Sequence, residues 1–356
     1  MEHTHLNAQQ ATPSPLQRAR TEAIVQGIYR GLLKREPEPA ALAYWCNAII
    51  SSGNPGSVLN AITESDEFNK GVTFDCEKAD TKRALAAFAQ PLLRDCPLVI
   101  VDVGAQELEG EEHIYAEIGN HHLPYQIIGF EPLEEKINES KQRNPDPRIT
   151  LFPTFIGDGN SHTFHINNPD ATSSLLPLNR LLIDDLVDLS PLSTVRTEQV
   201  TTNTLDNVLA NTSRIDFLKL DIQGFELSAL QHASAVLGRT NVIHCEVSFA
   251  EIYQGQALFS EVETLLRQHG FYFLDFSFQC HYPYLCKSEN TSRDRLGWSD
   301  AVFFKRAELL ESERDLLAQI LIAMLLYQKT SLAEFLAERY DAATGSNLIN
   351  IFCTTP

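Results

Sequence analysis

Three apolar runs in this sequence each end on an acidic residue, and these carboxylates are the first candidates for chemistry. The runs end on Asp102, Glu131 and Asp221, and glycine follows closely after the first and the last. Functional groups in open α/β sheets gather at the carboxyl ends of the strands. We therefore predict that the three runs are strands that contribute Asp102, Glu131 and Asp221 to one site.

The first two of these segments have the features of a cofactor site. Gly104 lets backbone approach a ligand closely, and Ala105 follows it. No glycine-rich dinucleotide motif and no phosphate-binding loop follows, which favours a ligand without phosphates. Glu131 can accept hydrogen bonds from two ribose hydroxyls, and Asp158, after a later strand, can accept one from an adenine amino group. The segment that follows Asp102 is therefore predicted to bind a nucleoside without phosphate. S-adenosylmethionine is the common cofactor of this kind.

Each cofactor-site residue also has a plainer structural explanation. Asp102 could brace the glycine turn, and Glu131 before Pro132 could be a carboxylate at a helix N-terminus. Asp158 lies between two glycines, a composition typical of a tight turn. Taken in order, the set favours cofactor binding more strongly for Glu131 and Gly104 than for Asp158.

The last acidic segment carries the candidates for catalysis. A transfer reaction between such a cofactor and an acceptor needs positioning and is helped by removal of a proton from the acceptor. Asp221 is the first candidate for the base or for a substrate anchor, and Glu246 ends the next strand. Lys219, on the same strand face as Asp221, could stabilise a developing alkoxide or pair with a buried carboxylate. Glu226 begins the following helix, where interaction with the helix dipole is the plainer role.

The sequence predicts no metal site. The histidine pairs at 121–122 and at 162 and 165 lack a third ligand at a recognisable spacing, and no pair of cysteines has the spacing of a zinc site. Asp221 and Glu246 could supply oxygen ligands to magnesium, but nothing in their spacing requires it.

Composition excludes some classes of protein. The 356 residues are 43% hydrophobic, with a formal net charge of −19 and an odd count of seven cysteines. Residues 1–95 hold 10 Lys and Arg against 11 Asp and Glu, so the excess of acid lies in the remainder. This charge disfavours nucleic-acid binding, which needs a positive field. With no signal-peptide pattern in the first twenty residues and no apolar run of about 20 residues, we expect a soluble cytoplasmic protein.

The chain divides into four predicted parts. We expect a disordered tail over 1–20, a helical module over 21–95, an α/β domain over 96–305 and a C-terminal helical segment over 306–356. The apolar stripe of the last part suits a core or a dimer surface, so a homo-oligomer through the terminal helices is one possibility. In the α/β part, strands alternate with helices, which predicts a doubly wound, mostly parallel sheet. The predicted strands are 98–103, 126–130, 149–156, 216–221, 241–247, 271–277 and 300–304; the last two should be antiparallel because no crossover helix separates them.

The α/β part resembles the FkbM-type methyltransferases. The matching stretches are 101–105, 129–132, 172–175, 204–206, 216–226, 269–271 and 298–301. The resemblance implies a Rossmann-like, class I methyltransferase sheet of seven strands, S-adenosylmethionine as cofactor, and methylation of a hydroxyl on a sugar, glycan or small metabolite. One departure is the loop over 106–110, where the family usually continues with Asn-x-Gly.

The helical module resembles a bacterial module of unknown function that is attached to surface-layer and glycan-related proteins. The matching stretches are 29–37, 43–45 and 64–68. A helical cap without a ligand of its own is at least as good an interpretation. A second hypothesis for the whole chain is therefore a non-catalytic, glycan-associated adaptor that retains the methyltransferase fold, and the altered loop over 106–110 is its best support.

Overall fold

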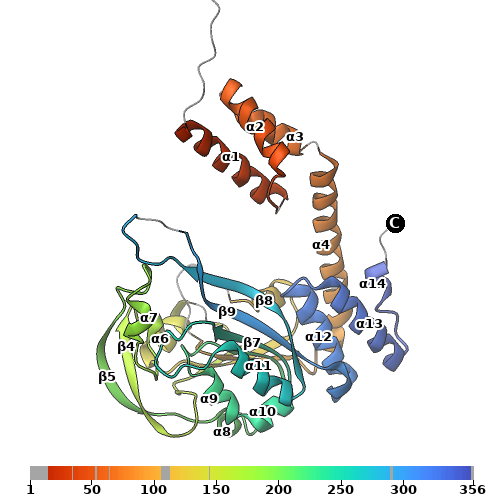
Figure 1. The fold of residues 1–356 in the computed structure, drawn as a ribbon. Helices are drawn as coiled ribbons and strands as arrows, with labels where there is room; N and C mark the ends of the chain where they lie inside the picture. The colour runs from red at the N-terminus through yellow and green to blue at the C-terminus, as the bar shows by residue number, and fades with distance from the viewer. Residues whose placement is uncertain are drawn as a thin grey trace, which may run out of the picture. The chain divides into compact units, whose positions relative to one another are not determined.

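The computed structural model describes residues 15–353 apart from 34, 53, 64, 106–112, 144 and 289–291. The chain forms two compact units, which divide between Thr81 and Lys82 (Figure 1). Residues 15–20, which the sequence assigns to a disordered tail, belong to the first helix, and the rest of that tail lies outside the described residues. The boundaries predicted at residues 95 and 305 stay predictions.

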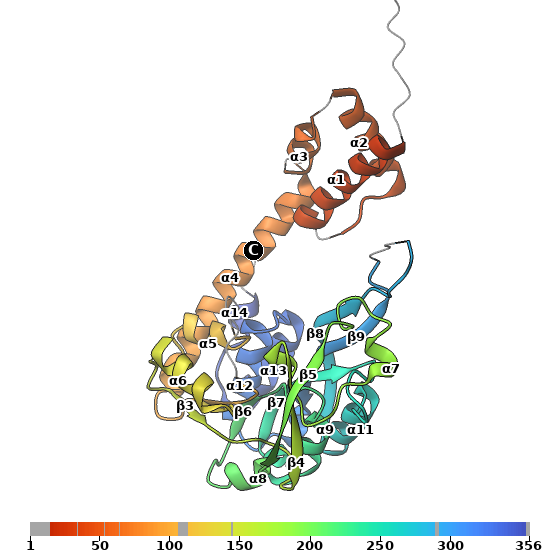
Figure 2. The same ribbon diagram turned by 90° about the vertical axis from the view of Figure 1, so that its left-hand side faces the viewer.

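The first unit is built from short helices packed on one another (Figure 2). These are α1 (Pro15–Leu33), α2 (Pro39–Ser52) and α3 (Gly56–Thr63), followed by α4 (Asp66–Leu92), which runs across the division between the units. The core shared by α1, α2 and α3 consists of Val25, Tyr29, Cys46, Ile49, Val58 and Ile62. The Trp45 side chain donates a hydrogen bond to the Tyr29 hydroxyl at 3.2 Å. The helical periodicity of the sequence thus corresponds to a small apolar core.

The second unit contains the predicted seven-stranded sheet. Its strands are β1 (Leu98–Val103), β2 (Tyr125–Phe130), β3 (Ile149–Phe152), β6 (Ile215–Leu220), β7 (Thr240–Ser248), β8 (Phe271–Tyr282) and β9 (Arg295–Lys305). Their order is β3-β2-β1-β6-β7-β9-β8. The first five strands in this order are parallel, whereas β9 pairs antiparallel with both β7 and β8. The doubly wound fold and the antiparallel pair near the end are confirmed.

Helices cover both faces of this sheet. Successive side chains of a strand point to opposite faces, so a strand contributes residues to the core on each side. On one face, Leu98 and Ile100 of β1 pack into a core with α12 (Glu313–Leu325), α13 (Thr330–Thr344) and the end of α4. On the other, Val101 and Val103 pack with the helices α8 (Leu205–Val208), α9 (Glu226–Gln231), α10 (Ser234–Gly238) and α11 (Phe259–Gln268). The remaining helices are α5 (Ala116–Asn120), α6 (Glu134–Arg143), α7 (Arg180–Ile183) and α14 (Asn350–Cys353).

The apolar stripe of the C-terminal segment is core. Residues 317–325 of α12 are all buried within this unit. No helix among the residues with an assigned structure is both long and apolar enough to cross a membrane.

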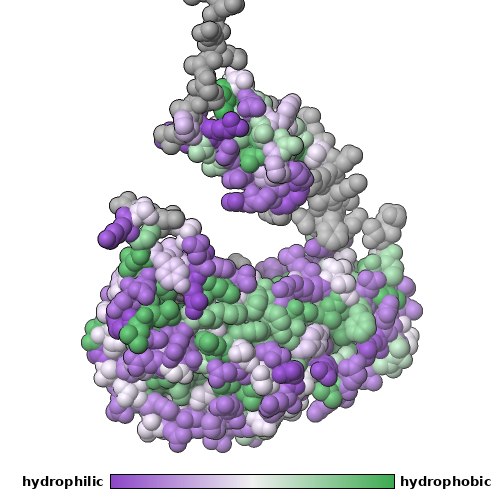
Figure 3. Space-filling view, viewed as in Figure 1, coloured by the Kyte–Doolittle hydropathy of each residue, from purple (hydrophilic) through white to green (hydrophobic). Residues whose placement is uncertain are grey.

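Sequence reasoning missed a two-stranded hairpin. β4 (Ser161–Asn168) and β5 (Ser193–Thr201) pair antiparallel, and neither is among the strands predicted from the sequence. β5 is exposed along nearly its whole length, so it lacks the apolar alternation that marks a half-buried strand. Between the two strands, residues 176–192 form a small apolar core with Ile252, Tyr253 and Tyr282. Figure 3 shows hydrophobic side chains on the surface over β8 and β9.

Candidate active site

One face of the sheet changes from apolar to charged along the strands. At the earlier paired positions of β1, β6 and β7 the side chains belong to the core: Ile100, Phe217 and Val242. Two residues later, on the same face, the paired positions are polar: Asp102, Lys219 and His244. Two residues further on, Glu246 of β7 pairs with Asp300 of β9, and Asp221 follows the end of β6. The parallel register therefore collects these groups at the carboxyl edge of the sheet, as predicted for functional groups.

Lys219 lies between two carboxylates. Its Nζ donates to Asp102 Oδ1 at 3.3 Å and lies 3.9 Å from Asp221 Oδ2. Burial disfavours the charged form of Lys219, but the attraction of Asp102 and Asp221 is stronger, so its pKa is raised. Lys219 is therefore an ammonium at neutral pH, able to stabilise negative charge but unable to act as a base.

Asp102 is a buried partner for its neighbours. Its side chain is inaccessible to solvent, and Oδ2 accepts a hydrogen bond from the Tyr115 hydroxyl at 2.7 Å. His113 Nδ1 lies 3.6 Å from the same oxygen. Asp102 does not line the cavity described below. Its carboxylate is positioned to hold Lys219 and Tyr115 in place.

Glu246 is a buried carboxylate that faces a cavity. It is 8% exposed, and the described part of the chain offers its side chain no hydrogen-bond partner. Burial, followed by the negative charges of Asp221, Glu226 and Asp300, raises the pKa of Glu246 well above its usual value. A carboxylate in this state needs hydrogen-bond donors, and a ligand in the cavity can supply them.

Glu226 serves the turn before α9. Its Oε1 accepts backbone hydrogen bonds from Ile222 at 2.8 Å and from Gly224 at 3.2 Å. Burial raises the pKa of Glu226 to about 7 despite these bonds. Its carboxylate is therefore used locally, in agreement with the plainer role that the sequence suggested.

The glycine turn after β1 fits closely against β6. Gly104 has φ +83°, and a Cβ added there would lie 1.9 Å from the Asp221 carbonyl oxygen. The backbone N–H groups of Gly104 and Ala105 both donate to the Phe130 carbonyl oxygen. Gly104 lines the cavity, whereas Ala105 is buried beside Gly129. Only glycine allows this approach of backbone to backbone; the altered loop over 106–110 lies outside the described residues.

Glu131 lies at the other side of this turn and also lines the cavity. One of its carboxylate oxygens, Oε1, accepts the Leu133 N–H at 2.9 Å. Burial raises the pKa of Glu131, and the bond from Leu133 opposes this shift. Oε2 has no hydrogen-bond donor among the residues that the structure covers, so it can receive hydroxyls of a ligand.

Asp158 lies outside the cavity lining. Its carboxylate accepts hydrogen bonds from the backbone and side chain of Asn160, from Thr202, and from His162 Nε2 at 2.7 Å. Burial alone would raise its pKa, but the bonds from Asn160 and His162 lower the pKa of Asp158 below its usual value. These partners hold the tight turn, which is the structural explanation that its glycine neighbours suggested.

A single cavity of about 800 Å³ connects these groups. Gly104, Glu131 and Ile156 line one end, whereas Glu246 and Asp300 lie at the other. The second end also carries aromatic side chains: Tyr253, Phe278, Tyr282 and Trp298. Ligand sites in proteins commonly measure about 300–1,000 Å³. The volume is therefore sufficient for a nucleoside cofactor together with part of a second ligand.

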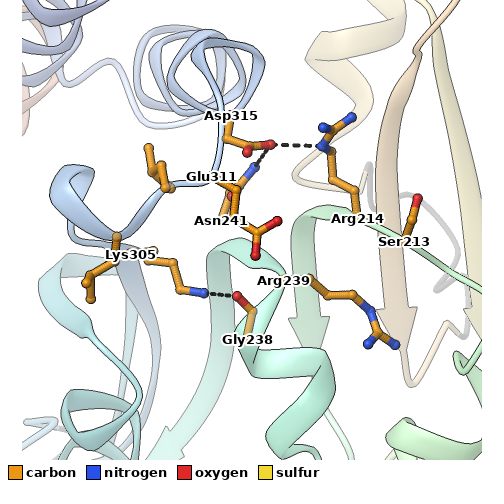
Figure 4. Close-up of a pocket in the computed structure, with 10 residues that line it drawn as sticks. Ser213, Arg214, Gly238, Arg239, Asn241, Lys305, Glu311 and Asp315 are labelled. Carbon is orange, nitrogen blue, oxygen red and sulfur yellow. Dashed lines mark hydrogen bonds and ion pairs between the residues drawn. The ribbon is translucent and has the colours of Figure 1, made fainter.

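A much smaller cavity of about 30 Å³ lies near the opposite ends of the strands (Figure 4). Asp315 there accepts bonds from Arg214 at 2.8 Å and Asn241 at 3.3 Å. Lys305 donates to the backbone carbonyls of Leu237 and Gly238 at the end of α10. The volume holds about one water molecule. Arg214 and Asp315 form an ion pair, and with Asn241 they connect α12 to the sheet.

Several residues of the large cavity escaped sequence reasoning. His244 and Asp300 are buried or half-buried in its wall, and Tyr115 and Tyr327 hydrogen-bond to residues of the charged face from distant segments. The alternation of side chains along β7 could have identified His244, because His244 lies two residues before Glu246 and therefore on the same face of the strand. The tyrosines carry no such local signal. The described residues contain no group of three or more His, Cys, Asp or Glu side chains placed to hold a metal ion.

Residues 102–273 match the family model of the methyltransferase FkbM domain. A curated relative, 2-O-methyltransferase NoeI of Sinorhizobium fredii, is 28% identical over 148 residues, which are 40% of this chain and 61% of that protein. The chain thus spans about three fifths of the length of this relative.

Two solved structures are similar at a low level. A precorrin-6y C5,15-methyltransferase from Geobacter metallireducens has 11% identity and a TM-score of 0.30, over 62% of this chain and 88% of its own. A TehB-like SAM-dependent methyltransferase from Corynebacterium glutamicum has 10% identity and a TM-score of 0.28, over 64% and 88%. TM-scores this far below 0.5 support no inference about the site.

The cavity fits the cofactor of an FkbM domain. Gly104 has no side chain, so the backbone at the end of β1 is accessible from the cavity. At the end of β2, Glu131 offers a carboxylate oxygen that has no partner among the described residues. Apolar side chains between them can enclose an adenine ring: Phe130, Phe155 and Ile156. The chain therefore carries an FkbM-type methyltransferase domain over residues 102–273, and the cofactor of this domain is S-adenosylmethionine.

Proposed function

We propose that this protein transfers a methyl group from S-adenosylmethionine to a hydroxyl of a sugar, a glycan or a small metabolite. The observation that carries the proposal is the cavity, in which the end suited to a nucleoside continues into a wall of carboxylates beside Lys219. The name of the relative, a 2-O-methyltransferase, supports a hydroxyl acceptor.

The cofactor end of the proposed site uses the first two strands. Glu131 accepts the ribose hydroxyls through its free oxygen, and Gly104 allows the ligand to approach the backbone. Asp102 supports this end indirectly by holding Tyr115 and Lys219. The bound cofactor supplies an electrophilic methyl group.

The acceptor end of the proposed site removes a proton and stabilises the charge that develops. Glu246 is the candidate base, since its carboxylate has no partner among the described residues and burial raises its pKa, which makes it a stronger proton acceptor. Asp221, whose side chain is 37% exposed, anchors the acceptor. Lys219 stabilises the developing alkoxide with its ammonium group.

Aromatic side chains complete the acceptor end. Trp298 donates its ring N–H to the Tyr282 hydroxyl at 2.9 Å, and the Tyr253 hydroxyl lies 2.8 Å from the Thr172 carbonyl oxygen. These bonds fix the rings as walls of the cavity. Rigid aromatic faces suit the C–H faces of a sugar ring, and the neighbouring carboxylates suit its hydroxyls.

Binding and turnover separate the enzyme from a non-catalytic adaptor. Calorimetric titration of the full-length protein with S-adenosylhomocysteine should show a single site. Incubation with radiolabelled S-adenosylmethionine and a panel of methyl hexosides and deoxyhexosides should then label a sugar. Absence of binding at roughly millimolar ligand would refute the cofactor assignment. Binding without labelling of any sugar or small polyol would favour the adaptor.

A further inference from the structure

His244 lies in the cavity wall but has no role in the proposed reaction so far. Its side chain is 6% exposed and is paired in register with Lys219 on the neighbouring strand. Nδ1 lies 2.9 Å from the Tyr327 hydroxyl, and Nε2 lies 3.7 Å from Asp300 Oδ1. The two ring nitrogens therefore face different groups, and the position of the ring proton decides what His244 can do.

Tyr327 determines that position. It follows the end of α12, its ring stacks on the His244 ring with centroids 6.2 Å apart, and both rings contact Phe217. Within the described chain, His244 Nδ1 is the hydrogen-bond partner of the Tyr327 hydroxyl. Burial, helped by the charge of Asp300, raises the pKa of Tyr327 well above its usual value, so the hydroxyl keeps its proton.

An enclosed hydroxyl group donates its proton where an acceptor is available. The Tyr327 hydroxyl therefore donates to Nδ1, which must then carry a lone pair. The ring proton of neutral His244 is left on Nε2, where the imidazole acts as a donor. In this tautomer Nε2 has no lone pair with which to accept a proton from the substrate.

The gap between His244 and Asp300 has the properties of a hydroxyl subsite. The distance of 3.7 Å is too long for a direct hydrogen bond. Both side chains line the cavity, and Asp300 lies opposite Glu246 in the sheet register. A hydroxyl of a ligand placed at this gap can accept from Nε2–H and donate to the Asp300 carboxylate.

We infer that Tyr327 fixes His244 as an Nε2–H donor, and that His244 and Asp300 together bind a second hydroxyl of the acceptor beside the one that is methylated. This inference rests on the proposed function. It deepens that function by specifying the acceptor as a compound with two neighbouring hydroxyls. His244 and Asp300 bind one of them, and the other lies at Glu246.

Nitrogen NMR tests the tautomer without any acceptor. Long-range proton–nitrogen spectra of the full-length protein with S-adenosylhomocysteine should show the neutral form of His244 with a protonated Nε2 and an unprotonated Nδ1. The His244→Gln variant assigns the signals. Tyr327→Phe should release the ring into a mixture of tautomers, whereas Tyr340→Phe, a buried tyrosine outside the cavity lining, should leave it unchanged.

A proton found on Nδ1 in the unaltered protein, or an unchanged His244 spectrum in Tyr327→Phe, would overturn the inference. This readout does not depend on turnover. If no acceptor is ever methylated, the proposed function fails while the tautomer is still decided. If methyl transfer is found with the proton on Nδ1, the inference alone fails.

Two substitutions at His244 test the subsite during turnover. Glutamine places an N–H group near the position of Nε2–H, whereas asparagine places one near Nδ1. With any sugar that is labelled in the screen, His244→Asn should raise KM about tenfold with little change in kcat, as expected for loss of a binding hydrogen bond. His244→Gln should restore most of the KM. An equal loss of kcat in both variants would show that His244 is a base and would overturn the inference.

Discussion

Asp102→Asn isolates the buried ion pair beneath the cavity. The substitution keeps the size of the side chain and the acceptor for Tyr115 but removes the negative charge 3.3 Å from Lys219 Nζ. Lys219 then retains Asp221, at 3.9 Å, and the more distant Asp300 as counter-charges. Loss of one partner from a fully buried pair costs about 3–5 kcal/mol. Because the Lys219 side chain is 16% exposed at the cavity, we expect about 2–3 kcal/mol here.

The double variant Asp102→Asn with Lys219→Met gives the matching control. It removes both charges, so most of the lost stability should return, with a coupling energy of about 1–3 kcal/mol in the double-mutant cycle. Asp102 does not line the cavity, so the affinity for S-adenosylhomocysteine should change little in Asp102→Asn.

Urea unfolding followed by Trp298 fluorescence measures these values. The chain has two tryptophans, so Trp45→Phe leaves a signal from the second unit alone. The pKa of Lys219 is raised in the folded protein, so the contribution of the pair should be complete below about pH 10.4, the value of a free lysine, and should disappear as the pH rises further. Two results would refute this account of Asp102. One is a double variant whose loss of unfolding free energy equals the sum of the two single losses, and the other is a stable Asp102→Asn protein that no longer binds cofactor.

Further substitutions test the other parts of the site. Glu131→Ala should weaken binding of S-adenosylhomocysteine by about 1–3 kcal/mol in calorimetry, whereas Asp158→Ala should lower thermal stability and leave that affinity nearly unchanged; equal effects on affinity would contradict the two assignments. Glu246→Gln should reduce the methyl-transfer rate about 10²–10⁴-fold without loss of cofactor binding, and the unaltered enzyme should gain rate with rising pH as Glu246, whose pKa is raised, loses its proton. Gly104→Ala should cost more than about 2 kcal/mol in the unfolding assay, since its Cβ would meet the Asp221 carbonyl; a wild-type midpoint would show that the turn can move.

The strand ends could be predicted from the sequence because each strand contains a short apolar run. Burial on both faces produces such runs in parallel sheets, and the first polar residue after each run marks the carboxyl edge. Asp102, Glu131 and Asp221 were found in this way. The strand β5 gave no such signal, because it is exposed along nearly its whole length and so has no face that must be apolar.

The roles of individual residues were harder to predict than their positions. Whether Asp102 meets a ligand or Lys219 depends on the register of β1 with β6, and the sequence does not contain that register in local form. The Tyr327 hydroxyl reaches His244 across 83 residues of sequence, a contact that only the packed C-terminal helices create. The sequence around Asp158 suited both a cofactor contact and a tight turn. In the structure Asn160 and Thr202 are among its hydrogen-bond partners in the turn.

Product analysis with deuterium-labelled S-adenosylmethionine tests the central claim most directly. The full-length protein is incubated with the labelled cofactor and a panel of methyl hexosides and deoxyhexosides, and the products are identified by mass spectrometry. We predict a deuterated methyl ether on a sugar hydroxyl that is formed by the unaltered protein and not by Glu246→Gln. A folded protein that binds S-adenosylhomocysteine but forms no methyl ether, or one whose product forms equally in Glu246→Gln, would contradict the account.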